Sequence, residues 1–146
     1  MRDIIHTLEQ QHRALEREVA MLEGALAAKS ARGVRASLDK LLAMLTAHFE
    51  LEHQQLYPPF LQRVGREDPE TSKVVHLFHD NLQRIADGVL AFFKRWSGEL
   101  DATRLSELAA EWKTTLKVLA GRLRDEERVL HPLYVRLFSA APATAP

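Results

Sequence analysis

A chain of 146 residues, with 46% hydrophobic and 27% charged side chains, has the composition of one soluble globular domain rather than of a disordered or fibrous protein. Its 20 Lys and Arg balance its 20 Asp and Glu, so neither nucleic acid nor an anionic membrane is an expected partner. The absence of cysteine excludes disulfides, thiol nucleophiles and iron–sulfur ligation, and leaves nitrogen and oxygen as metal ligands. Without a long apolar segment, we expect a cytoplasmic protein.

Apolar residues recur every three or four positions along nearly the whole chain, which is the period of amphipathic helices that face a core. The first predicted helix carries its apolar stripe from Leu8 to Leu26 and ends at residues 30–33. The second follows from Val34 and is halted or kinked at the two prolines at 58–59. These two helices make up the first half of the predicted fold.

The third predicted helix begins at residues 68–70, where an aspartate, a proline and a glutamate supply a cap, a first helical position and an early acid. The fourth begins near Asp101 and runs to Pro132. Four such helices with short connections predict an all-α, antiparallel up-down-up-down four-helix bundle over residues 1–138. The small residues of 139–146 predict a flexible tail.

The two halves of the chain repeat the same apolar pattern, and polar residues interrupt it at matching positions. The matched pairs are His12 with His79, His48 with Arg122, and Glu52 with Glu126. Burying such groups costs free energy unless each finds a partner, so their joint placement needs a common cause. Helix bundles build metal sites from imidazoles and carboxylates that project inward from several helices. These ligands suit iron, manganese or zinc.

The polar positions also form a recognisable set of motifs. They are His12, His48-x-x-x-Glu52 with the ending Leu56-Tyr57-Pro58, His79, and Glu126-Glu127 followed by Leu130 and Pro132. Over residues 4–138 this set resembles the hemerythrin-like family, also called the HHE cation-binding domain. Members of that family are four-helix bundles with a di-iron centre bridged by two carboxylates, and they bind or sense oxygen or handle iron, nitric oxide or peroxide.

The resemblance implies a role for each of five candidate metal ligands. His12 and His48 would bind one metal, Glu52 and Glu126 would bridge, and His79 would belong to the second metal. Where the family pattern has a fourth-helix histidine, however, this chain has Arg122. A guanidinium stays protonated and has no lone pair to offer a metal.

Arg122 can instead supply the positive charge that an ion would bring. Its guanidinium can form forked hydrogen bonds to Glu126, and to Glu52 where the side chain extends that far. Two interpretations follow. In one, the chain binds one or two metal ions, iron before manganese or zinc, in an oxygen-sensing, redox-sensing, carrying or iron-handling role, with dioxygen as a small ligand. In the other, the cluster is metal-free and the bundle is a regulatory protein-interaction module whose partner the sequence does not indicate.

The remaining histidines are expected outside the site. His53, His6 and His131 are predicted to face solvent, and His76 to lie at the edge of its apolar stripe. The glycines are isolated, and no nucleotide-binding loop or catalytic-triad motif occurs. The sequence therefore does not indicate an enzyme, and no catalytic residue is assigned.

Overall fold

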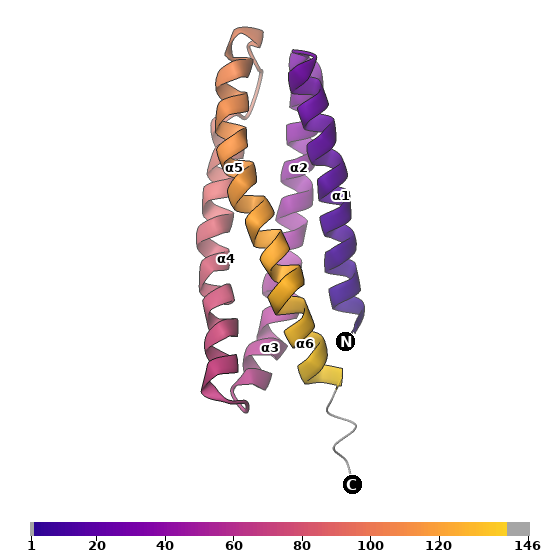
Figure 1. Cartoon of the computed structure of the whole chain (residues 1–146). Coiled ribbons are helices and arrows are strands. Elements are labelled where there is room, and N and C mark those ends of the chain that lie inside the picture. The colour runs from indigo at the N-terminus through magenta and orange to yellow at the C-terminus, as the bar shows by residue number, and fades with distance from the viewer. Residues whose placement is uncertain (1, 140–146) are drawn as a thin grey trace.

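The computed structural model describes residues 2–139, which form an antiparallel up-down-up-down bundle of four rods (Figure 1). In chain order the elements are α1 (Arg2–Ala27), α2 (Ala31–Leu51), η1 (Glu52–Leu56), α3 (Tyr57–Val64), α4 (Pro69–Arg95), η2 (Ala102–Arg104), α5 (Leu105–Asp125), η3 (Glu126–Leu130) and α6 (His131–Ser139). Within this part of the chain no strand occurs, so the predicted all-α bundle is confirmed. The predicted tail lies outside the described residues except for Ser139, which ends α6.

Local capping bonds start the helices where the sequence signals them. Ser30 caps α2 by accepting a hydrogen bond from the backbone N–H of Gly33 at 3.0 Å. Asp68 caps α4 by accepting from the backbone N–H of Thr71 at 2.8 Å. Asp101 caps the short 3₁₀ turn η2, and α5 begins only after that turn. These caps satisfy backbone donors that have no partner inside a helix.

Neither the second nor the fourth rod ends at its prolines, so the predicted end of the fourth helix at Pro132 is wrong. In a continuous α-helix, the ring of Pro58 or Pro132 would clash with the carbonyl four residues earlier. A π-helical turn precedes each proline and widens the helix there. In η1 the N–H of Tyr57 donates to the Glu52 carbonyl, five residues back, and η3 repeats this bond to Glu126.

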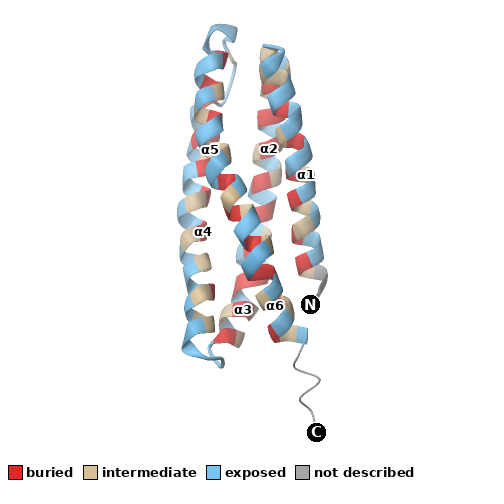
Figure 2. Cartoon of the chain, in the orientation of Figure 1, coloured by how far each residue is buried: buried red, intermediate tan, exposed pale blue. Residues whose placement is uncertain are grey.

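Buried residues lie mainly on the inward faces of the rods (Figure 2), and most of them are apolar. Toward the end that holds the α1–α2 and α4–α5 turns, the core is mainly apolar and includes Leu22, Leu38 and Trp112. Burying each leucine of this kind contributes roughly 1.5–3 kcal/mol. The polar positions of the repeat lie farther along the rods, so the apolar end holds the helices in register around them.

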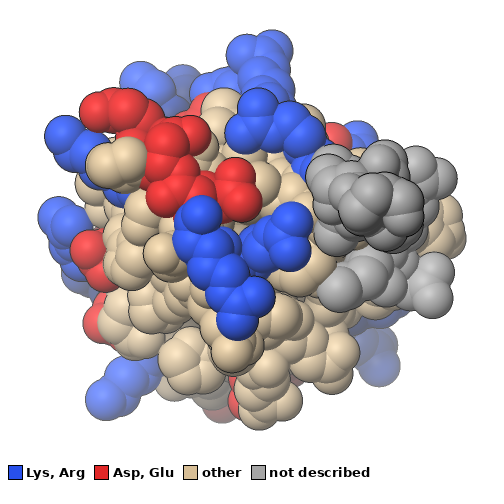
Figure 3. Space-filling model, turned by 90° about the horizontal axis from the view of Figure 1, so that it is seen from below, with Lys and Arg blue, Asp and Glu red and all other residues tan. Residues whose placement is uncertain are grey.

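The surface of the bundle carries charges of both signs. Seen end-on from the side of α3 and α6, a group of acidic side chains lies beside a group of basic ones (Figure 3). Among residues 2–139, no helix combines the length and the apolar character that crossing a bilayer requires.

Candidate metal centre

Four of the five predicted ligands meet in the core, where the two π turns face α1. The side chains of His12, His48, Glu52 and Glu126 are completely buried. The Nε2 atom of His12 lies 3.0 Å from Oε1 of Glu126 and 3.2 Å from Nε2 of His48. Nε2 of His48 lies 3.5 Å from Oε1 of Glu126 and 3.6 Å from Oε1 of Glu52. Ligands about 2.1 Å from one ion are about 3–4 Å apart, so the separations among His12, His48 and Glu126 suit a shared cation, with Glu52 beside His48.

An oxygen acceptor outside the cluster orients each of these imidazoles. Nδ1–H of His12 donates to a carboxylate oxygen of Glu127 at 2.6 Å, and Nδ1–H of His48 donates to the amide oxygen of Gln11 at 2.8 Å. Both rings consequently turn Nε2 toward the carboxylates. Metal-binding histidines characteristically donate their second ring N–H in this way.

The two buried glutamates differ in how strongly they hold a proton. Burial and the neighbouring negative charge of Glu126 raise the pKa of Glu52 well above its usual range. Burial alone would raise the pKa of Glu126 as well, but hydrogen bonds from His12 and His48 and the charge of Arg122 hold it well below its usual range. Protonation is therefore favoured at Glu52 and disfavoured at Glu126. Both carboxyl oxygens of Glu52 are buried, and within residues 2–139 no group donates a hydrogen bond to either of them.

Arg122 points into the core from α5, as the repeat predicts, with only 4% of its surface exposed. Its Nε donates to Oε2 of Glu126 at 2.7 Å, and its Nη2 donates to the hydroxyl of Tyr57 at 2.7 Å. Its Nη1 donates to the carbonyl of Phe78 at 2.9 Å. Burial alone would lower the pKa of Arg122, but the carboxylate of Glu126 raises it, so the side chain is a fixed cation.

His79 is the predicted ligand that the structure does not bring into the cluster. Its side chain is half-buried on α4, and its ring lies 4.8 Å from the ring of Tyr57 and 6.5 Å from that of His53, between centroids. Two groups of ligand atoms within residues 2–139 lie close enough to hold one ion: His12 with His48 and Glu126, and Glu52 with Glu126 and His131. Tyr57 and Arg122 fill the space between His79 and the glutamates.

The prediction that His131 faces solvent is wrong, because only 1% of its surface is exposed. On a regular α-helix, a residue five positions after Glu126 would point away from it. The π turn η3 widens the helix by one residue and brings both side chains to the inner face. The internal repeat contained a signal for the burial of His131. In the repeat, His131 aligns with Tyr57 of the family-like Leu-Tyr-Pro ending. His6, His53 and His76 are exposed, as expected.

Comparison with known proteins gives one family. The family model of the hemerythrin HHE cation binding domain matches residues 3–137. No curated protein and no solved structure shows a significant match. The match covers nearly the whole chain. The helical bundle and the buried histidine and glutamate side chains of this chain accord with a cation-binding domain. The chain therefore belongs to the hemerythrin HHE cation-binding domain family.

Proposed function

We propose that this bundle binds one transition-metal ion, iron before manganese or zinc, among His12, His48, Glu52 and Glu126. The observation that carries the proposal is the Glu52 carboxyl group, which is completely buried and receives no hydrogen bond. A buried carboxyl group without a partner is unfavourable, and a bound cation would replace its proton and supply the missing partner. The Nε2 atoms of two oriented imidazoles lie beside it, and mixed nitrogen and oxygen ligands suit iron.

Arg122 favours one ion over two. It takes the place that the fourth-helix histidine has in the family pattern. A guanidinium offers no nitrogen lone pair to a metal, and three hydrogen bonds hold this one on that side of the glutamates. Its positive charge also compensates Glu126 from the side opposite to the imidazoles. With both glutamates deprotonated, Arg122 leaves one negative charge, which one ion on the imidazole side would compensate.

The role that we propose is sensing or carrying of oxygen or redox state, or handling of iron. When bound, iron would supply an open coordination position and a one-electron redox change. The chain's own part is to orient the imidazoles and to exclude water. A groove of about 420 Å³ between α1 and α5, lined by Leu15, Leu119 and Glu127 among others, reaches the carboxylate that orients His12. This groove supports the approach of a small uncharged molecule such as dioxygen.

Metal analysis of the purified protein, reconstituted anaerobically with Fe²⁺ and then desalted, tests this proposal. We expect about one iron per chain and a melting temperature that rises with free Fe²⁺, because a ligand that binds only the folded state stabilises it. His48→Ala should abolish the bound iron and the rise. His6→Ala, which removes an exposed histidine of α1, is the matched control and should retain both.

Two outcomes would overturn the proposal. About two irons per chain would show that Arg122 does not displace an ion. No bound metal and an unchanged melting curve with iron, manganese and zinc would instead support a metal-free regulatory interaction module. The observation that favours this second function is the complete hydrogen bonding of Arg122, which supplies the cluster with a cation of its own.

A further inference from the structure

Within residues 2–139, His131 has a buried nitrogen with no hydrogen-bond partner. Its Nδ1 lies 2.9 Å from a carboxylate oxygen of Glu9, whereas no described group bonds to its Nε2. A carboxylate only accepts hydrogen bonds, so Nδ1 carries the proton of the neutral ring. Nε2 is then left with an unused lone pair in the core. Burying an acceptor in this state is unfavourable, which points to a missing partner.

The position of the ring identifies the kind of partner. His131 belongs to a group in which one of its ring nitrogens and carboxylate oxygens of Glu52 and Glu126 all lie within 4.8 Å of one another. Its ring also stacks against His12, with centroids 5.6 Å apart and an angle of 25° between the planes. Because Nδ1 is engaged with Glu9, Nε2 is the atom free to bind a cation shared with the two glutamates.

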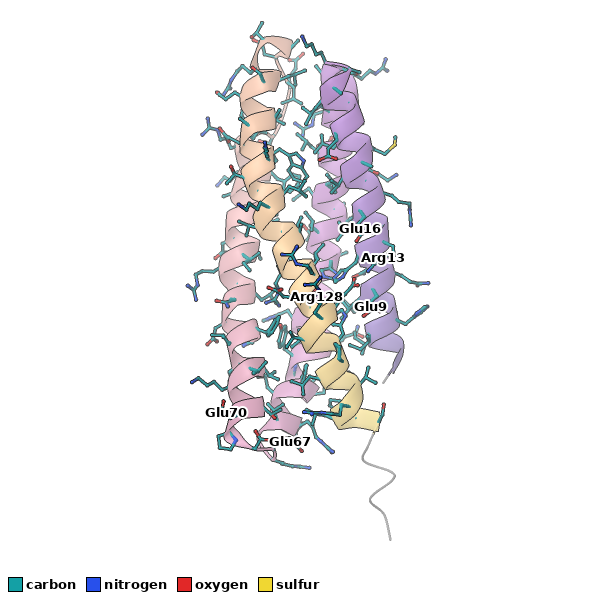
Figure 4. All side chains as sticks on the ribbon, viewed as in Figure 1. Glu9, Arg13, Glu16, Glu67, Glu70 and Arg128 are labelled. Carbon is teal, nitrogen blue, oxygen red and sulfur yellow. The ribbon has the colours of Figure 1, made fainter. Side chains whose placement is uncertain are left out.

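The three buried imidazoles follow one pattern. Each donates Nδ1–H to an outer oxygen: Glu127 for His12, Gln11 for His48 and Glu9 for His131. Glu9 is a half-buried residue of α1 on the side that faces the rod carrying His131 (Figure 4). Such outer acceptors set the tautomer and the ring orientation of metal-binding histidines.

In the other half of the repeat, the position that corresponds to His131 carries a side chain whose polar atom is hydrogen-bonded. Tyr57 follows η1 as His131 follows η3, and both side chains point inward. The Tyr57 hydroxyl accepts from Arg122, so its polar atom is already satisfied. No group of residues 2–139 donates to Nε2 of His131, and an ion from solution would take the corresponding place.

From this arrangement we infer that His131 is a third imidazole ligand of the ion, through Nε2, and that Glu9 is its positioning residue. The inference rests on the proposed function, because it requires that the cluster bind a metal. It adds an imidazole nitrogen to the two carboxylates of its own group, which shares Glu126 with the group of His12 and His48. That set fits a divalent ion of borderline character such as Fe²⁺, Mn²⁺, Co²⁺ or Zn²⁺.

Proton NMR of the Co²⁺-loaded protein can count the bound imidazoles. Paramagnetic Co²⁺ strongly shifts the Nδ1–H proton of each ring that binds through Nε2, and these protons disappear in D₂O. We expect three such signals in the native chain and two in His131→Phe. His6→Gln, a change at an exposed histidine, is the matched control and should retain three.

Glu9→Ala keeps the test valid if His131→Phe does not fold, because Glu9 is 41% exposed and lies outside the core. We expect it to weaken Co²⁺ binding by about 10–100-fold, the usual effect of removing an outer acceptor. The signal of His131 should also broaden, because its proton would exchange with water. Three unchanged signals in His131→Phe, or unaltered Co²⁺ affinity and signals in Glu9→Ala, would overturn the inference.

His48→Ala separates this failure from a failure of the proposed function. If the native chain binds Co²⁺ and His48→Ala weakens binding at least tenfold, while His131→Phe and Glu9→Ala match the native chain, the metal site stands and His131 is not a ligand. If the native chain binds no Co²⁺, both the proposed function and the inference fail.

Discussion

The two oxygens of Glu126 face two different environments. Oε1 lies 3.0 Å from the imidazole of His12 and 3.5 Å from that of His48, whereas Oε2 accepts from the guanidinium of Arg122 at 2.7 Å. Both environments are built on the same repeated backbone, a helix, a π turn and a second helix. The difference is chemical: one side presents imidazole nitrogens, which can bind a metal once deprotonated, and the other contains a permanent cation.

This contrast shows how a repeated bundle can make its two halves unequal without changing its fold. On the arginine side, the compensating charge is covalently attached, so hydrogen bonds to Tyr57 and Phe78 complete the site. On the imidazole side, the carboxyl group of Glu52 receives no hydrogen bond. We therefore expect substitutions on the arginine side to change mainly folding stability, and substitutions on the imidazole side to change mainly metal affinity.

Glu126→Gln should have the largest effect on stability because it acts on both sides. It keeps the side-chain shape but leaves the buried guanidinium of Arg122 without its carboxylate, at a cost of about 3–5 kcal/mol. Urea unfolding in the presence of a chelator measures this cost. Glu16→Gln, at an exposed residue of α1, should change stability by less than about 0.5 kcal/mol. Equal losses in the two variants would contradict the assignment of Glu126 to the core cluster.

Arg122→His should convert the arginine side into a second metal side. It removes the cation and supplies a nitrogen lone pair one helical turn before Glu126, close to His79. We expect bound iron to rise from about one to about two per chain, and stability in chelator to fall by about 2 kcal/mol as the hydrogen bonds of the guanidinium are lost. Iron analysis together with urea unfolding checks both effects. A loss of stability with no gain of metal would identify Arg122 as a purely structural ion-pair partner.

Tyr57→Phe should affect the arginine side alone. Removing the hydroxyl leaves one N–H of a buried guanidinium without an acceptor, which should cost about 1.5 kcal/mol in urea unfolding. Metal affinity, measured by isothermal titration with Fe²⁺, should stay within about twofold of the native value, because Tyr57 does not contact the imidazoles of His12 and His48. A tenfold change in affinity without a change in stability would place Tyr57 on the metal side.

Asp68→Asn should have the smallest effect, since this carboxylate caps α4 in solvent. Hydrogen bonds from Thr71 lower the folded-state pKa of Asp68 below its ordinary value of 3.8. A lowered pKa means that the charged cap stabilises the fold fully above that ordinary value, and that this contribution disappears as pH falls through the folded-state pKa. The melting temperatures of the two proteins should therefore differ slightly at neutral pH and converge in acid, as the pH falls through the lowered pKa of Asp68. A constant difference across this range would exclude the charge as the cause.

The sequence pattern was sufficient to predict the bundle and most of the buried polar cluster. The three- and four-residue apolar period specifies helices, and the polar exceptions on it place His12, His48, Glu52 and Glu126 on inward faces. Because residues one turn apart share a helix face, their convergence followed from helical geometry and from the repeat. The inward guanidinium of Arg122 was predictable for the same reason.

Only the packed structure revealed what the π turns do. Pro58 and Pro59 were expected to halt or kink the second helix and Pro132 to end the fourth, yet a π turn before Pro58 and another before Pro132 let the rods continue and shift the inward face by one residue. This shift buries His131, and it sets Tyr57 between His79 and the cluster. A regular helical period does not predict either placement. The clash of the proline ring is relieved locally, and which side chain then points inward depends on contacts between rods.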